Sequence, residues 1–147
     1  MIPIHTFNGT HREVGYQVGQ LFSEQIHWIM DQHEELQNRL KPYIATADGR
    51  RRFDTFLALN TAIYPELVEE LKSIAAGADY SFEDLFLAHL RGEILPFDIH
   101  QDVAGCSTCT LKNDDILVMG HNEDAMLRFR DFLYLADVTI TGSQRFM

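Results

Sequence analysis

The sequence has little cysteine, little positive charge and no long apolar run, and each shortage excludes a class of protein. Two cysteines in 147 residues are too few for a framework of disulfides. Twelve Lys and Arg against 22 Asp and Glu leave a formal net charge of −10, which argues against nucleic acid or an anionic membrane surface as the main partner. No apolar run approaches the ~18 residues of a membrane span.

The beginning of the chain also lacks the features of a secretory leader. Met1 to His5 has no basic flank, and no long apolar stretch follows it, so we expect no signal peptide. Together with the free thiols this predicts a cytoplasmic protein. Hydrophobic residues make up 46% of the chain, which is enough for a buried core, and the length predicts one domain, 1–147.

The first two thirds of the chain carry helical patterning. Residues 2–7 predict a short strand, which Pro3 makes an edge strand or a strand start, and the capping box Thr10-x-x-Glu13 then opens a helix. Apolar residues at helical spacing extend this helix over 10–41, where Pro42 stops it. Gly15 and Gly19 lie on it, and each costs a helix ~1 kcal/mol. We therefore expect another element to approach that face closely.

Three further helices are predicted before the sequence changes character. Asp48-Gly49 marks a loop before the second helix. Pro65 starts the third in its favoured first-turn position. Ser81-x-x-Asp84 opens the fourth, and Gly92 or Pro96 ends it.

From Cys106 onward the period is that of strands. Residues 106–111 and 116–120 predict a hairpin about the polar turn 112–115, and 132–140 predict a third strand. A helical N-terminal half followed by antiparallel strands predicts the α+β class. Three strands leave a small sheet with little to cover it, so we expect the natural chain to continue.

Cys106 lies at this change from helix to strand and is the candidate nucleophile. Gly105 has no side chain and leaves its carbonyl open to attack by the thiol. If the bond between them is cut, the new α-amino group can take the thiol proton. The other candidate bases are His89, His100 and His121. A buried, inert cysteine is the plain alternative.

A second polar cluster, 120–124, follows the hairpin and is folded back toward Cys106. Asn122 can donate a hydrogen bond to a developing oxyanion. Asp124 can anchor an α-ammonium or orient a substrate group. Ordinary turn chemistry explains the cluster equally well.

Cys106-x-x-Cys109 also has the spacing of a redox or zinc motif. Redox pairs of this kind begin a helix, whereas strand residues follow here. Positions i and i+3 of a strand face opposite sides. A zinc site needs two further ligands, and no second CxxC or HxxxH is present.

Four stretches, taken in order, resemble a known family. They are 9–19 with its glycines, the Pro-started 64–77, 81–85, and Gly105-Cys106-Ser107-Thr108 followed by 120–124. This combination is similar to the acyl-coenzyme A:6-aminopenicillanic acid acyltransferase family. That family is a group of N-terminal-nucleophile (Ntn) enzymes related to penicillin acylases and choloylglycine hydrolases.

The resemblance implies a precursor that its own thiol cuts between Gly105 and Cys106. It divides the chain into an α segment, 1–105, and the start of a β segment, 106–147, of a truncated αββα sandwich. Cys106 would form an acyl-enzyme and pass the acyl group to water or an amine. Asp124 matches the family's active-site aspartate, while Asn122 falls where related hydrolases often carry arginine.

The sequence thus predicts a cysteine Ntn acyltransferase or amide hydrolase. Its substrate would be a small-molecule acyl amide or acyl thioester, with no cofactor and no metal. One alternative is an inactive, truncated member that acts as a binding or oligomerisation module through its helical half. The other is a CxxC redox or zinc protein. The remainder of its own chain or a second copy would cover the incomplete sheet.

Overall fold

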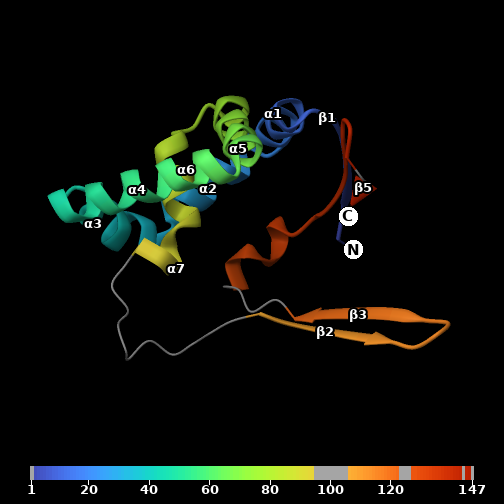
Figure 1. The fold of residues 1–147 in the computed structure, drawn as a ribbon. Coiled ribbons are helices and arrows are strands. Elements are labelled where there is room, and N and C mark those ends of the chain that lie inside the picture. The colour runs from blue at the N-terminus through green and yellow to red at the C-terminus, as the bar shows by residue number, and fades with distance from the viewer. Residues whose placement is uncertain (1, 95–105, 123–126, 144, 147) are drawn as a thin grey trace. The chain divides into compact units, whose positions relative to one another are not determined.

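The computed structural model describes residues 2–94, 106–122, 127–143 and 145–146 (Figure 1). It contains both helices and strands, in agreement with the α+β class. Contacts divide the chain into two units, Met1–Pro96 with Tyr134–Met147, and Phe97–Leu133. Among the described residues, no helix is both long enough and apolar enough to span a membrane.

The first unit consists mainly of helices around one core. The largest fully buried side chains of this core are Phe53, Leu36, Leu40, Leu87 and Ile94. In chain order the helical elements are α1 His11–Leu21, α2 Ser23–Gln32, the π-helical turn η1 Leu36–Leu40, α3 Lys41–Ile44, α4 Ala47–Ile63, α5 Pro65–Ala78, α6 Phe82–His89 and α7 Arg91–Ile94.

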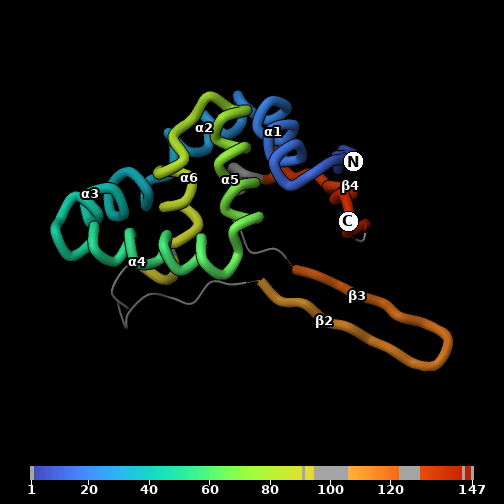
Figure 2. The backbone as a smooth tube through the Cα atoms, turned by 45° about the horizontal axis from the view of Figure 1, so that its top comes forward, coloured from blue at the N-terminus to red at the C-terminus, as the bar shows by residue number. Residues whose placement is uncertain are grey.

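Helices α1 and α5 pack side by side with their backbones in contact (Figure 2). A Cβ added at Gly15 would lie 2.3 Å from the carbonyl oxygen of Glu70, and one at Gly19 would lie 2.2 Å from that of Ile74. No side chain fits at either position. The predicted close approach at these glycines is confirmed, and it offsets their helix cost.

The single helix predicted over 10–41 is wrong, because the chain leaves helical geometry twice. At Phe22 the backbone turns (φ −111°, ψ 19°) and the ring stacks on Tyr134 with centroids 4.1 Å apart. At His33 it is extended, and the buried ring's Nδ1 accepts the N–H of Leu36 at 3.2 Å. Tertiary contacts therefore override the local periodicity at both breaks.

The predictions for Pro42 and Gly49 are also wrong. Pro42 does not stop a helix, since it lies in the first turn of α3, where its missing N–H is not needed. Asp48-Gly49 lies inside α4, whose cap Thr46 accepts the N–H of Gly49 at 3.1 Å. A Cβ at Gly49 would lie 2.1 Å from the carbonyl oxygen of Tyr43. Close packing, rather than a turn, requires this glycine.

The later helix starts are confirmed. Helix α5 begins at Pro65, and the Ser81 hydroxyl accepts the N–H of Asp84 at 3.2 Å to cap α6. Helix α6 ends at His89 rather than at Gly92, which lies within α7. Pro96 lies outside the described residues.

The first unit also contains a three-stranded sheet in the order β1-β4-β5, formed by β1 Ile4–Gly9, β4 Leu135–Ile140 and β5 Arg145–Phe146. β1 is an edge strand, as predicted, and it runs parallel to β4. The expectation that the third strand joins the hairpin in one antiparallel sheet is wrong, because β4 pairs with β1 and β5. Val138 and Ile140 are buried there against Phe7 and Val14, and this burial selects the partner.

An ion pair holds β5 against β4. The guanidinium of Arg145 donates to both carboxylate oxygens of the buried Asp137, with Nε 2.6 Å from Oδ1. These hydrogen bonds and the cation's charge hold the pKa of Asp137 below its ordinary value. The fork geometry fixes β5 in register despite its length of two residues.

The second unit contains a hairpin of β2 Ser107–Lys112 and β3 Leu117–Asn122. Its turn is built by Asn113, whose Oδ1 accepts the N–H groups of Asp115 at 3.0 Å and Ile116 at 2.8 Å. The predicted hairpin is confirmed. The third strand, predicted over 132–140, begins later as β4 Leu135–Ile140, because Phe132 ends a 3-10 helix, η2 Leu127–Phe132.

Candidate active site

Cys106 lies immediately before β2, and its thiol is free and exposed. Cys109 is also free and exposed, but it lies within β2. Because side chains alternate along a strand, β2 directs positions 106 and 109 to opposite sides. Among the described residues, no group of three or more His, Cys, Asp or Glu side chains is arranged to hold a metal ion.

The hairpin register brings the two predicted polar motifs together. Ser107 pairs with Asn122, and Thr108 pairs with His121. In the second pair, Thr108 Oγ1 lies 2.8 Å from His121 Nδ1. The end of β3 therefore returns to the beginning of β2, next to Cys106, as the hairpin pattern predicted. The Thr108–His121 hydrogen bond was not predicted, although the register of a short hairpin implies the pairing.

The remaining predicted site residues are distributed as follows. Gly105, Asp124 and His100 lie outside the described residues. His89 belongs to the other unit, at the end of α6, where its Nδ1 lies 2.8 Å from the carbonyl oxygen of Leu85. Of the candidate bases in the described chain, His121 alone shares the unit of Cys106.

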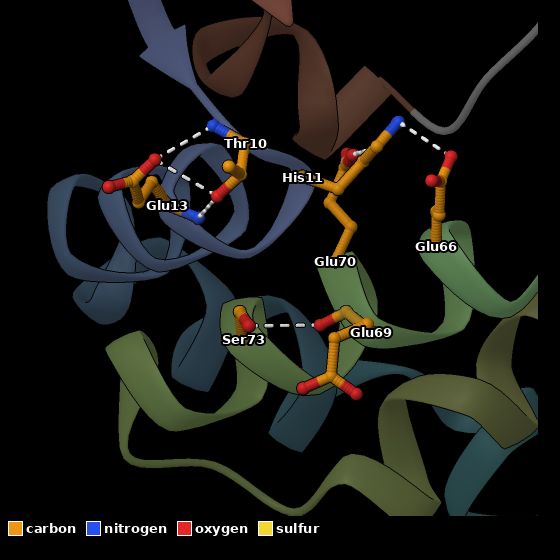
Figure 3. A network of polar contacts seen from close by, with 7 residues as sticks. All are labelled: Thr10, His11, Glu13, Glu66, Glu69, Glu70 and Ser73. Atoms are coloured by element: carbon orange, nitrogen blue, oxygen red, sulfur yellow. Dashed lines mark hydrogen bonds and ion pairs between the residues drawn. The ribbon is translucent and has the colours of Figure 1, made fainter. Parts of the chain in front are cut away.

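In the helical unit, a separate cluster of polar side chains around His11 joins the beginning of α1 to α5 (Figure 3). His11 Nδ1 lies 2.5 Å from Glu70 Oε2, and its Nε2 lies 3.7 Å from Glu66 Oε2. Beside it the predicted capping box is confirmed, since Glu13 Oε2 accepts the backbone N–H of Thr10 at 2.8 Å. That bond lowers the pKa of Glu13. These contacts fix the start of α1 on α5.

A hollow of about 720 Å³ adjoins this cluster along α1 and α5. Two of its polar side chains have partners within α5. Lys72 Nζ lies 3.6 Å from Glu69 Oε2, and the Ser73 hydroxyl donates to the Glu69 carbonyl oxygen at 2.9 Å. No cysteine lines it. The hollow is a groove between packed helices, and the predicted nucleophile Cys106 is not among its lining residues.

Comparison with known proteins gives one informative similarity. No family model matches the chain. The beta-alanyl-dopamine/carcinine hydrolase of Drosophila melanogaster is 32% identical over 139 residues, a match that covers 90% of this chain and 36% of that protein. The chain thus spans about a third of the length of this curated relative. Because nine tenths of the chain is matched, the similarity extends beyond the helices into the residues that follow Cys106.

Proposed function

We propose that the chain is the first part of a self-cleaving cysteine amide hydrolase of the Ntn type, with Cys106 as nucleophile. The observation that carries this proposal is the hairpin register, which brings Thr108, His121 and Asn122 to the strand end where the free Cys106 thiol is exposed. The hydrolase named in the comparison supports hydrolysis of an acyl–nitrogen bond.

In the proposed maturation, the Cys106 sulfur attacks the carbonyl carbon of Gly105. The C–N bond between the two residues breaks, the nitrogen takes a proton, and a thioester remains. Water hydrolyses the thioester, which leaves Gly105 with a free carboxylate and Cys106 with a free thiol and a new α-amino group. That amine, with an ordinary pKa of about 7.7–8.0, then serves as the base in each turnover.

In the mature enzyme, the thiolate attacks the carbonyl of a small-molecule acyl amide, and the amine leaves with a proton. Water, or an acceptor amine, removes the acyl group from sulfur. An acyl thioester can enter the same acyl-enzyme. Asn122 would donate to the oxyanion, and Asp124 would orient the substrate. None of these steps uses a cofactor or a metal, and the free thiols suit a cytoplasmic location.

The exposed hairpin supports the proposal that a larger αββα sandwich contains it. Leu111 and Val118 lie on one face, with exposed fractions of 68% and 52%, and Leu117 and Met119 lie on the other, with 67% and 71%. A two-stranded hairpin is marginal in water and needs a layer to pack against. Further chain, or a second copy, would supply a layer on each face.

The same exposed faces favour one competing function, a binding module without activity. A redox or zinc role is disfavoured because β2 separates Cys106 from Cys109. A thiol-reactive acyl probe distinguishes the alternatives, since a hydrolase should label at Cys106 much faster than at Cys109, whereas the two exposed thiols of a binding module should label alike.

The decisive experiment measures the intact mass of the purified full-length protein, of which this chain is the proposed first part, under reducing, denaturing conditions. We expect two fragments, one that ends at Gly105 and one that begins at Cys106. The Cys106→Ala variant should give one uncut species, and the matched Cys109→Ala variant should be cut like the wild type. An uncut wild-type chain, or a cut Cys106→Ala chain, contradicts the proposal.

A further inference from the structure

The helical unit contains a second, smaller hollow that the proposed function does not use. Helix α5 packs against both α4 and α6 (Figure 2), and a hollow of about 270 Å³ is lined by residues of these three helices and of the turn between α4 and α5. Neither a cysteine nor a hairpin residue is found among the described residues that line it. Binding at this hollow therefore needs no group of the hairpin.

The apolar part of the lining belongs to the core of the unit. Val68 and Phe86 are buried, and Leu71 and Ile74 pack against the same core. The ring of Phe86 meets the ring of Phe53 edge-on, with centroids 5.6 Å apart. Core packing thus holds these side chains in place, and a largely pre-formed apolar lining is the usual character of a small-molecule site.

Exposed apolar side chains also surround the hollow. Tyr64 and Leu67 line it, and each is more than half exposed. Leu59 and Ile63, one turn apart at the end of α4, are also more than half exposed. Single exposed apolar residues are ordinary, but a group of them beside a hollow is typical of a binding surface.

Two polar side chains of the lining retain an atom that can accept a hydrogen bond. His89 Nδ1 lies 2.8 Å from the carbonyl oxygen of Leu85. Because a carbonyl only accepts, the hydrogen is on Nδ1, and Nε2 of the neutral ring is left as an acceptor. Asn60 Nδ2 donates to the carbonyl oxygen of Phe56 at 2.9 Å, which leaves Oδ1 to accept.

The charge of the lining favours a cation. Among the described residues that line the hollow, Glu70 supplies the one carboxylate, and none is Lys or Arg. Glu70 Oε2 lies 2.5 Å from His11 Nδ1, but a carboxylate has lone pairs for further donors. A ligand that fits this lining brings an apolar body, hydrogen-bond donors and positive charge.

We propose that this hollow is a binding site for a small amine. The apolar body of the amine packs against the core side chains of the lining, and its protonated nitrogen donates to the acceptors there, with Glu70 supplying the opposite charge. The volume lies just below the ~300–1,000 Å³ of sites for drug-sized ligands, so the ligand is small. The inference goes beyond the proposed function and does not depend on it, since binding needs neither cleavage nor Cys106.

The experiment titrates the full-length protein with 2-phenylethylamine. Its neutral counterpart is 2-phenylethanol and its anionic counterpart is 3-phenylpropanoate, and ligand-observed NMR measures the binding of all three. We expect the amine to bind with a dissociation constant of about 1 mM, a modest affinity for so few atoms. The other two should bind roughly 10-fold more weakly, because they lack the charge-assisted hydrogen bond.

Four variants locate the binding. Glu70→Gln removes the charge at nearly constant shape, so it should weaken amine binding by roughly 10-fold and leave 2-phenylethanol binding unchanged. Its matched control is Glu69→Gln, which removes the same charge from a residue outside the described lining and should change neither. Leu67→Ala leaves the His11–Glu70 contact intact and should weaken the amine and the alcohol alike. Leu59→Ala, at a similarly exposed leucine outside the described lining, should weaken neither.

Three results would overturn the inference. The first is no detectable amine binding at ~10 mM, and the second is equal binding of the amine, the alcohol and the carboxylate. The third is an equal effect of Glu70→Gln and Glu69→Gln, which would assign the attraction to the net charge of −10. None of these results bears on the proposed self-cleavage, which the masses of the fragments test separately.

Discussion

The helical unit and the β2–β3 hairpin differ in how many of their side chains are buried by contacts within the same region. Phe53 and Leu87 are fully buried in the helical unit, and no buried side-chain nitrogen or oxygen of the described residues lacks a partner. Every residue of the two hairpin strands is exposed. The helical unit is thus stabilised by its own contacts, whereas the strands of the hairpin with the candidate site bury no residue among the described parts of the chain.

The largest expected effect that tests this comparison comes from Phe53→Ala. Phe53 is fully buried, so its truncation should lower the free energy of unfolding by about 3–5 kcal/mol. The matched change Met119→Ala, at a side chain that is 71% exposed, should change it by less than ~0.5 kcal/mol. Urea unfolding followed by circular dichroism measures both. Similar losses in the two variants would show that the hairpin is buried in solution.

A smaller effect is expected from adding one methyl group to each region. Gly19→Ala places a Cβ 2.2 Å from the Ile74 carbonyl oxygen, so α1 and α5 must separate at a net cost of roughly 1–3 kcal/mol. Gly120→Ala in β3 meets no atom within 4 Å and should be close to neutral. Thermal unfolding midpoints of both variants check this. A destabilised Gly120→Ala chain would mean that another element closes on the hairpin.

The smallest expected effect is a pH dependence confined to the sheet of the helical unit. Arg145 lowers the folded-state pKa of Asp137 below its ordinary value of about 3.9. The pair therefore stabilises the fold above that ordinary value, and its contribution is lost as the pH falls through the lowered pKa. Asp137→Asn should be less stable than the wild type at pH 7, and the difference should shrink toward pH 2. A constant difference across that range would assign the effect to packing instead.

Features set by neighbouring residues were predictable from the sequence. The capping box at Thr10, the start of α5 at Pro65 and the hairpin turn at Asn113 all depend on contacts within a few positions. A close contact at the glycines of α1 was predictable, because glycine destabilises a helix and packing against another element can compensate for that loss. Their partner was not, since 9–19 carries no signal that selects α5.

Features set by distant residues were not predictable. Phe22 belongs to the apolar periodicity of 10–41, and only its stacking on Tyr134 shows why the helix breaks there. The parallel pairing of β1 with β4 joins segments more than 120 residues apart, which no local pattern encodes. A strand pattern reveals the alternation of buried and exposed positions but does not identify the neighbouring strand.

The candidate site was predictable in part for the same reason. Cys106 and Asn122 approach one another through a hairpin that the sequence encodes locally. Which side of the hairpin each residue faces depends on the pairing register of β2 and β3, which places Thr108 opposite His121 and Ser107 opposite Asn122. Chemical roles depend on that division, and composition alone does not provide it.

The parallel pairing of β1 with β4 would make each product of a cut a ligand for the other. β1 lies before residue 105 and β4 lies after it, and the two strands pair from Ile4–Leu135 to Gly9–Ile140. Phe7 and Val14 on one piece share a core with Val138 and Ile140 on the other. The pieces would thus remain a non-covalent heterodimer, as in fragment complementation, and separate only under denaturing conditions.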